Sequence, residues 1–318
     1  MVMYFIVSAV IAGCLFPFFI AFLNQKNHQQ AVSEYSLESF KIKQKTPTLG
    51  GVIFVLIPLV IMLILDFKSF SSIKNILVYL TYLGYALIGF VDDLKIILEK
   101  NNKGLPASVK FTAQVVLALV FFILYRQYIS TEISIPFIKG LSIDLGWFYA
   151  LLVLLMFSGA SNGVNLTDGM DGLAGGTSFL AMIPFIIFAY LQHETSLVYF
   201  GLALLGSLAA YLFFNRHPAR IFMGDTGALA LGAVLAAYAL VLKQEVSLIL
   251  IGGVFVFETA CVMLQIGSVK LRKKRIFKYT PIHYSFTLSG WKETNVVKFF
   301  WFLGFIFMGL GLWAGLSI

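Results

Sequence analysis

Acidic residues stand at the ends of several strongly apolar runs in this sequence. Asp92 and Asp93 end one run, Asp168 and Asp171 precede another, and Asp225 opens a third. A charge at membrane depth costs about 3 kcal/mol on insertion scales, so carboxylates are rare there and mark functional sites when they recur. Carboxylates that converge at one end of a helix bundle favour a bound divalent cation or proton transfer.

The adjacent pair Asp92 and Asp93 is the first candidate for this chemistry. Neighbouring carboxylates repel each other unless a cation or a proton relieves the repulsion. A divalent metal ion or a proton-accepting role would explain the pair. The alternative interpretation is a solvated helix end that faces Lys95.

A second candidate is a run of four polar residues at intervals of three, namely Asn162, Asn165, Asp168 and Asp171. In a helix they would form one stripe of two amides followed by two carboxylates. The glycines between them equally favour a break in the helix, and irregular backbone at membrane depth is tolerated where it lines a cavity. Both versions predict a polar cleft, and a plain turn between two helices is the alternative.

A third candidate is the segment from Asn215 to Gly227, which contains Asp225 at the expected start of a helix. The helix dipole favours an anion at that place, so a simple capping role is the alternative. Phe222 supplies an aromatic ring, and Gly224 allows the close approach of a ligand. The segment therefore indicates a binding site as well as a helix start.

Three further segments carry weaker signals. Lys43 and Thr48 precede an apolar run, and backbone N–H groups at a helix start beside a lysine form an anion site. His283 lies among aromatic residues in a long polar loop. Glu258 and Gln265 are seven residues apart and share a helix face, where we expect them to satisfy neighbours in the bundle.

The composition indicates the class of fold that must position these residues. The chain has 318 residues, of which 59% are hydrophobic and 12% charged, whereas soluble domains carry about 25% charged residues. Continuous rather than alternating apolar runs indicate helices. We therefore predict one all-α integral-membrane domain over residues 1–318, a bundle of about ten transmembrane helices, with a small hairpin in 127–144. The predicted spans are about 2–23, 49–66, 74–92, 109–126, 145–162, 174–191, 196–214, 226–243, 246–268 and 297–317.

The distribution of cationic residues predicts the orientation. Eighteen of the 23 Lys and Arg residues fall in alternate connections on one side, which the positive-inside rule assigns to the cytoplasm. Both termini are then external, and the polar cleft faces the cytoplasm. The net charge of +8 reflects this asymmetry and needs no nucleic-acid partner, and the last basic loop suits anionic membrane lipids. The predicted cytoplasmic loops are about 24–48, 93–108, 163–173, 215–225 and 269–296.

The motifs together resemble a known family. Thr-Pro-Thr-Leu-Gly-Gly, Phe-Val-Asp-Asp, Asn-Leu-Thr-Asp-Gly-Met-Asp-Gly-Leu-Ala, Phe-Met-Gly-Asp-Thr-Gly and Pro-Ile-His occur in the order seen in phospho-N-acetylmuramoyl-pentapeptide-transferases, between Lys43 and Trp301. The resemblance implies a homodimer in a bacterial cell membrane, Mg²⁺ as cofactor, and a role in peptidoglycan synthesis. The implied reaction moves phospho-MurNAc-pentapeptide from UDP to undecaprenyl phosphate, which gives lipid I and UMP.

The resemblance also implies roles for single residues. Asp92 and Asp93 match the catalytic pair, Asp225 matches the Mg²⁺ ligand, and His283 joins the catalytic group. Asp92 and Asp93 are further metal-ligand candidates. Phe222 is expected under the uracil ring. The full set of expected substrate-binding residues is Lys43, Thr48, Lys110, Asn162, Asn165, Asp168, Asp171, Asn215, Phe222 and Gln265.

One departure from the family pattern keeps alternatives open. The family shows three consecutive histidines where this chain has His283, Tyr284 and Ser285. A tyrosine hydroxyl donates a hydrogen bond but carries no positive charge at neutral pH. A sister transferase that uses UDP-GlcNAc or a related donor is therefore the first alternative. A secondary transporter is the second, although inverted repeats and midplane charges, which are typical of transporters, are not evident.

Overall fold

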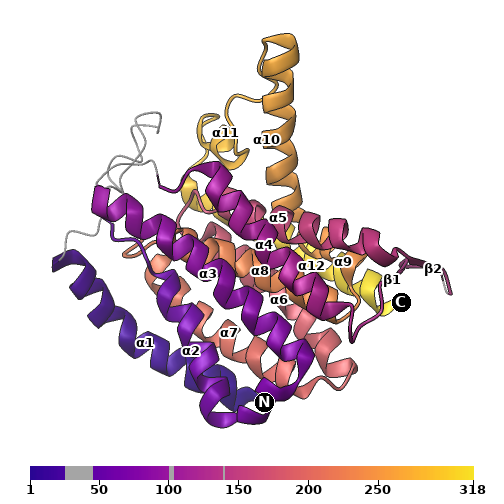
Figure 1. Ribbon diagram of the computed structural model, residues 1–318. Helices are drawn as coiled ribbons and strands as arrows, with labels where there is room; N and C mark the ends of the chain where they lie inside the picture. Colours follow the sequence, from indigo (N-terminus) through magenta and orange to yellow (C-terminus); the bar gives the residue numbers. More distant parts are fainter. Residues whose placement is uncertain (26–45, 100–103, 139) are drawn as a thin grey trace.

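The computed structural model describes residues 1–25, 46–99, 104–138 and 140–318, and these residues are mostly helical (Figure 1). Every predicted apolar run contains helix, and nine helices in the described ranges are long and apolar enough to cross a membrane. This confirms an all-α, multi-pass membrane protein. The helices are α1 Val2–Gln25, α2 Gly51–Leu65, α3 Ile73–Glu99, α4 Ala107–Tyr125, α5 Tyr149–Thr167, α6 Leu173–Leu191, α7 Thr195–Asn215, α8 Gly224–Val241, α9 Glu245–Ile251, α10 Gly253–Arg272, α11 His283–Thr287 and α12 Glu293–Leu316.

Two predicted spans differ from the structure. Helix α2 has 15 residues, which is about 22 Å of helix against a hydrocarbon core of about 30 Å. The predicted span 246–268 is divided at Gly252 into α9 and α10, so the prediction of one continuous helix was wrong. A side chain at Gly253 would lie 2.5 Å from the ring of Phe307 in α12, so the break lies at a close contact with α12. Helix α10 extends away from the rest of the bundle (Figure 1).

Several helices continue into segments that we expected to be loops. Helix α3 reaches Glu99, so Asp92 and Asp93 lie within its last turns rather than at its end. Helix α5 reaches Thr167, so Asn165 is helical. Hydropathy predicts where a chain leaves the apolar phase, whereas a helix continues for as long as its backbone hydrogen bonds are satisfied. The catalytic candidates are consequently held on regular, rigid elements.

Helix α8 is the centre of the bundle, and every residue from Thr226 to Val241 is buried. Glycines let neighbouring helices approach it closely, as is common where membrane helices pack. A side chain at Gly89 of α3 would lie 2.2 Å from the carbonyl oxygen of Asp225. A side chain at Gly232 would lie 2.3 Å from the carbonyl oxygen of Ala160 in α5. The start of α8 is thus held against α3, and its middle against α5.

Both termini lie at the end of the bundle opposite Asp225. Tyr4 stacks on Tyr199 at the start of α7, with ring centroids 4.2 Å apart. Gln244, which follows α8, donates to the carbonyl of Gly315 near the end of α12. The predicted hairpin is present at the same end, where β1 (Glu132–Ser134) pairs antiparallel with β2 (Ser142–Asp144). Short 3₁₀ segments, η2 (Phe67–Ser71) and η3 (Gly146–Phe148), complete this end.

Candidate active site

Three carboxylates from two helices meet at the start of α8. Asp92 and Asp93 come from α3 and Asp225 from α8, and each offers an oxygen within 4.8 Å of the others. The close contact at Gly89 makes this possible, because that residue lies one turn before the aspartate pair on α3. Asp92 and Asp93 are both buried. The structure therefore brings together the three predicted catalytic aspartates.

Asp93 caps α8 from a neighbouring helix. Its carboxylate accepts the backbone N–H of Asp225 at 3.0 Å and that of Thr226 at 2.9 Å. It also accepts the Thr226 hydroxyl at 2.6 Å. These N–H groups belong to the first turn of α8, which has no partners within its own helix. Asp93 thus fixes the position of Asp225.

Lys110 of α4 and Asn165 of α5 complete the cluster. The Lys110 ammonium pairs with Asp225 and lies 3.8 Å from an oxygen of Asp92. The Asn165 amide donates to the other oxygen of Asp225 at 2.6 Å. Asp92 in turn accepts the backbone N–H of Leu105 at 2.8 Å. Four helices, α3, α4, α5 and α8, therefore supply the side chains of one polar group.

The donor set of this cluster fits Mg²⁺. Three carboxylates against one ammonium leave net negative charge, and Mg²⁺ prefers oxygen ligands from one or two carboxylates plus substrate phosphates. The Lys110 ammonium lies between Asp92 and Asp225, which shows that a cation is accommodated there. Since three donors already engage Asp93, the residues that would hold the ion are Asp225 and Asp92.

The turn between α5 and α6 forms a second polar group. The predicted polar stripe is helical as far as Asn165, and the chain then turns through Asp168 and Asp171. Asp171 accepts the backbone N–H of Ala219 at 3.1 Å and lies 2.9 Å from His217 Nδ1. Its own N–H donates to Glu293 of α12 at 2.9 Å.

Asn215 ties the same turn to the loop before α8. Its side-chain oxygen accepts the N–H of Gly172, and its amide donates to the carbonyl of Ile221, both at 2.8 Å. Asn162 likewise engages its own surroundings, because its amide donates to the carbonyl of Ser158 at 2.8 Å and to Gln114 at 3.3 Å. In this structure the side-chain amides of Asn215 and Asn162 both form hydrogen bonds within the protein near the site.

The start of α2 packs against the loop before α8. The N–H groups of Gly50 and Gly51 donate to carbonyl oxygens of that loop at 2.8 and 3.0 Å, and Phe222 donates back to Pro47. These N–H groups are not available to an anion, so the predicted anion site at this helix start is not formed by them. Thr48 is buried near Asp93, and a Cβ atom added at Gly224 would lie 2.8 Å from the Thr48 hydroxyl and 2.4 Å from an Asp93 oxygen. Lys43 lies outside the described residues.

The polar face of α10 binds the long loop that contains His283. Gln265 accepts the N–H groups of residues 276 and 277 and donates to the carbonyl of Phe277, at 2.9 to 3.1 Å. Glu258 accepts the N–H of Ile282 at 2.8 Å and contacts His283. This agrees with our expectation that Glu258 and Gln265 satisfy neighbouring groups. His283 is completely buried.

The sequence analysis gave no role in the site to four residues that the structure places at these groups. Thr226 follows Asp225 directly, and its position at a helix start was a usable signal. His217 lies in a motif that we singled out for its other residues. Glu258 was assigned to the bundle, and Glu293 gave no signal because its partner Asp171 is 122 residues away in the chain.

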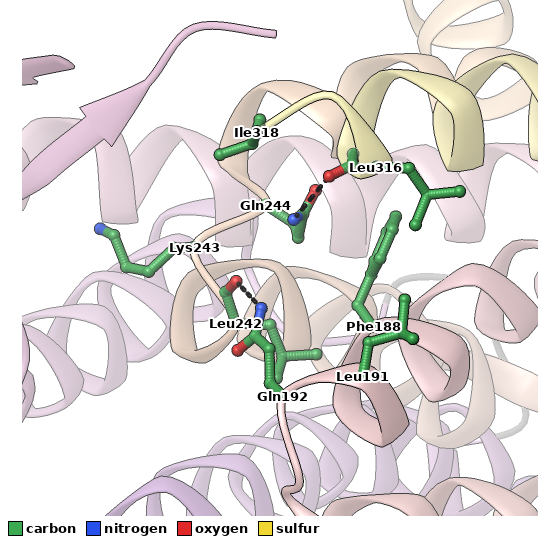
Figure 2. A pocket seen from close by; sticks show the side chains of 9 residues that line it. Phe188, Leu191, Gln192, Leu242, Lys243, Gln244, Leu316 and Ile318 are labelled. Atoms are coloured by element: carbon green, nitrogen blue, oxygen red, sulfur yellow. Dashed lines mark hydrogen bonds between the residues drawn. The ribbon is translucent and has the colours of Figure 1, made fainter. Parts of the chain in front are cut away.

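A separate pocket of about 260 Å³ lies at the opposite ends of the same helices (Figure 2). It is lined by the ends of α6 and α12 and by residues that follow α6, α8 and α12. Figure 2 shows Gln192 and Gln244 bonded to backbone carbonyls and Lys243 pointing away from the apolar lining. The carboxylates lie at the other end of α8, so this pocket is not the candidate active site.

The model of glycosyl transferase family 4 matches residues 75–243, more than half of the chain, so this multi-pass membrane protein belongs to that family. Similar curated proteins narrow this class. A phospho-N-acetylmuramoyl-pentapeptide-transferase of Halalkalibacterium halodurans is 44% identical over 97% of this chain and 95% of its own length. Those of Oceanobacillus iheyensis and Staphylococcus aureus are 43% and 41% identical over 95% and 98% of their lengths. The chain belongs to the phospho-N-acetylmuramoyl-pentapeptide-transferase family, as its motifs indicated.

Proposed function

We propose that this chain transfers phospho-MurNAc-pentapeptide from UDP-MurNAc-pentapeptide to undecaprenyl phosphate in peptidoglycan biosynthesis. The observation that carries the proposal is the cluster of Asp92, Asp93 and Asp225 with Lys110, at the ends of membrane helices. An oxygen of the lipid phosphate attacks the phosphorus that bears the sugar. The bond from that phosphorus to the bridging oxygen breaks, so lipid I forms and UMP leaves with the bridging oxygen.

Each residue of the cluster has a separate task in this reaction. Bound Mg²⁺ would neutralise charge on the donor diphosphate and on the leaving UMP. Asp225 and Asp92 would hold the cation, and Asp92 also orients the lipid phosphate for in-line attack. Asp93 positions Asp225 through the backbone of α8. Lys110 moves from the carboxylates to the phosphate oxygens, where its charge opposes the charge that develops in transfer.

The nucleotide is bound at the turn after α5, on the side of Asn165 away from the carboxylate cluster. Asp168 and Asp171 supply acceptors for the uridine, and Phe222 lies under the uracil ring. Asn215 keeps this turn and the loop of Phe222 in register. The same nucleotide site includes Asn162, Thr48 and Gln265. It also includes Lys43, which lies outside the described residues. This assignment rests on the motif positions of the family together with the two polar groups described above.

The orientation and assembly complete the proposal. Because cationic residues concentrate on the side of the site, that side faces the cytoplasm of a bacterial cell. The soluble nucleotide sugar is found in this compartment. Both termini are then external. The protein acts as a homodimer, as the family resemblance implies. Anionic membrane lipids contact the basic residues that follow α10.

The donor specificity is tested by supplying purified protein with Mg²⁺, undecaprenyl phosphate and one nucleotide sugar at a time. We expect UMP release and a lipid I product of the correct mass with UDP-MurNAc-pentapeptide, and neither with UDP-GlcNAc. Turnover of UDP-GlcNAc alone would support the sister-transferase alternative. The reason to test this alternative is that Tyr284 and Ser285 replace two family histidines.

A further inference from the structure

Glu258 and His283 form a buried pair between α10 and the loop beside it. The Nδ1 atom of His283 lies 3.0 Å from one oxygen of Glu258, and the other oxygen accepts the N–H of Ile282 at 2.8 Å. Both side chains are 0% exposed. A carboxylate that accepts a backbone N–H on one oxygen and meets Nδ1 with the other is best satisfied when Nδ1 carries a proton.

The other ring nitrogen has no hydrogen-bond partner in the described part of the chain, although it is buried. An unsatisfied buried polar atom costs about 1–3 kcal/mol, and such exceptions point to a function. Nε2 faces Gly169 in the turn after α5, where a Cβ atom would lie only 2.3 Å from it. The free acceptor is therefore aimed at the turn that carries Asp168 and Asp171.

The two residues that replace the other family histidines already have structural contacts. The Tyr284 hydroxyl donates to the carbonyl of Gly169 at 3.2 Å, and burial raises the pKa of Tyr284, which keeps the hydroxyl protonated. The Ser285 hydroxyl accepts the N–H of Tyr279 and donates to its carbonyl. Of these three positions, His283 alone has a buried side-chain polar atom without a hydrogen-bond partner in the described part of the chain.

We infer that Glu258 is a positioning residue that holds His283 with its proton on Nδ1, so that Nε2 accepts a hydrogen bond from an N–H or O–H group of the bound nucleotide sugar. The inference rests on the proposed function. Because the ring has no exposed surface, the contact forms when Tyr284 leaves the Gly169 carbonyl and the loop moves off the turn. A carboxylate that orients a histidine through Nδ1 is a general device for presenting Nε2.

Nitrogen-15 NMR of histidine-labelled protein in detergent reads the ring directly. The chain has four histidines, and His283→Gln identifies the relevant signal by its loss. We expect Nδ1 protonated and Nε2 unprotonated in the native protein. Glu258→Ala should move the population towards protonation of Nε2. If the alanine variant does not fold, Glu258→Gln replaces it, because glutamine preserves the size of the side chain and one carbonyl acceptor. We expect this variant to shift the population in the same direction by a smaller amount.

Steady-state kinetics test the consequence for the substrate. Glu258→Ala and His283→Gln should each raise KM for UDP-MurNAc-pentapeptide about 10-fold, the scale of one hydrogen bond, with a smaller change in kcat. The double variant should be no worse than His283→Gln, because both changes remove one contact. Ser268→Ala is the matched control, since Ser268 binds the same loop at the carbonyl of Lys274 without touching His283. It should change neither KM nor the ring signal.

Three outcomes would overturn the inference. They are a native ring protonated on Nε2, an unchanged KM in His283→Gln, and strictly additive effects of the two substitutions. Native protein that shows the expected ring state but releases no UMP from either donor would instead contradict the proposed function. The two proposals therefore fail in distinguishable ways.

Discussion

At the scale of single residues, the three aspartates of the cluster have different surroundings and therefore different expected roles. Asp93 receives three donors from the first turn of α8, whereas Asp92 receives the backbone N–H of Leu105 and faces Lys110. The sequence alone treated Asp92 and Asp93 as equivalent. The structure separates Asp93, which caps α8, from Asp92, which faces Lys110 and which we expect to face the substrate.

Substitution of the pair tests this separation. Asp92→Asn should lower kcat about 100-fold or more, the usual scale for loss of a charged catalytic group, with an unchanged melting temperature in detergent. Asp93→Asn should lower both kcat and stability, because loss of a helix cap costs about 1 kcal/mol. The double variant should lose less than the product of the two single effects. An Asp93→Asn protein of native stability would contradict the capping role.

The sequence predicted the members of the cluster better than their contacts. Asp92, Asp93, Asp225 and Asn165 were identified because charged and amide groups at the ends of apolar runs are unusual enough to notice, whereas Lys110 was identified only through the family resemblance. Partners that meet across the fold could not be identified in this way. The expected substrate contacts of Asn215 and Gln265 were inferred without knowledge of the backbone groups that these amides bind.

At the scale of elements, the site depends on how closely α3 and α8 pack. Gly89 has no side chain where the backbone of Asp225 passes, and a Cβ atom there would lie 2.2 Å from the carbonyl oxygen. Hydropathy predicted the existence of these helices, but it does not encode their separation. It also did not predict the break at Gly252, because the apolar character continues across it and the break accompanies packing against Phe307.

Alanine substitution at two glycines tests the helix contact. Gly89→Ala should force α3 from α8, separate Asp225 from Asp93, and lower kcat about 10-fold or more, since small misplacements near reacting groups are costly. Gly159→Ala is the matched control, because it also lies within a membrane helix but has open space around its Cβ position. The control should be active and at least as stable as the native protein. Equal losses in both variants would rule out a specific contact.

At the scale of the whole molecule, the candidate catalytic carboxylates lie at one end of the bundle. The carboxylate cluster lies at the start of α8, and both termini and the hairpin lie at the other end. The apolar side chains exposed on outer helices such as α1, α4 and α12 suit contact with lipid. This division predicts that the substrate enters from one side of the membrane.

Cysteine labelling tests the orientation. In a background without Cys14 and Cys261, a cysteine at exposed Lys273 should react with an impermeant reagent only from the cytoplasmic side. A cysteine at exposed Ser142, in the hairpin, should react only from outside. The basis is the concentration of eighteen of the 23 cationic residues on one side. The reverse labelling pattern would place the site away from the cytoplasmic nucleotide pool.

The central claim is that the carboxylate cluster is the site of Mg²⁺-dependent transfer, and UMP release as a function of Mg²⁺ concentration tests it most directly. With undecaprenyl phosphate and UDP-MurNAc-pentapeptide, the native protein should release UMP only when Mg²⁺ is present. Asp225→Asn should fold normally and release UMP at least about 100-fold more slowly at every Mg²⁺ concentration. Asp144→Asn, a carboxylate change at the opposite end of the bundle, should behave as the native protein. Near-native, Mg²⁺-dependent release by Asp225→Asn would contradict the account.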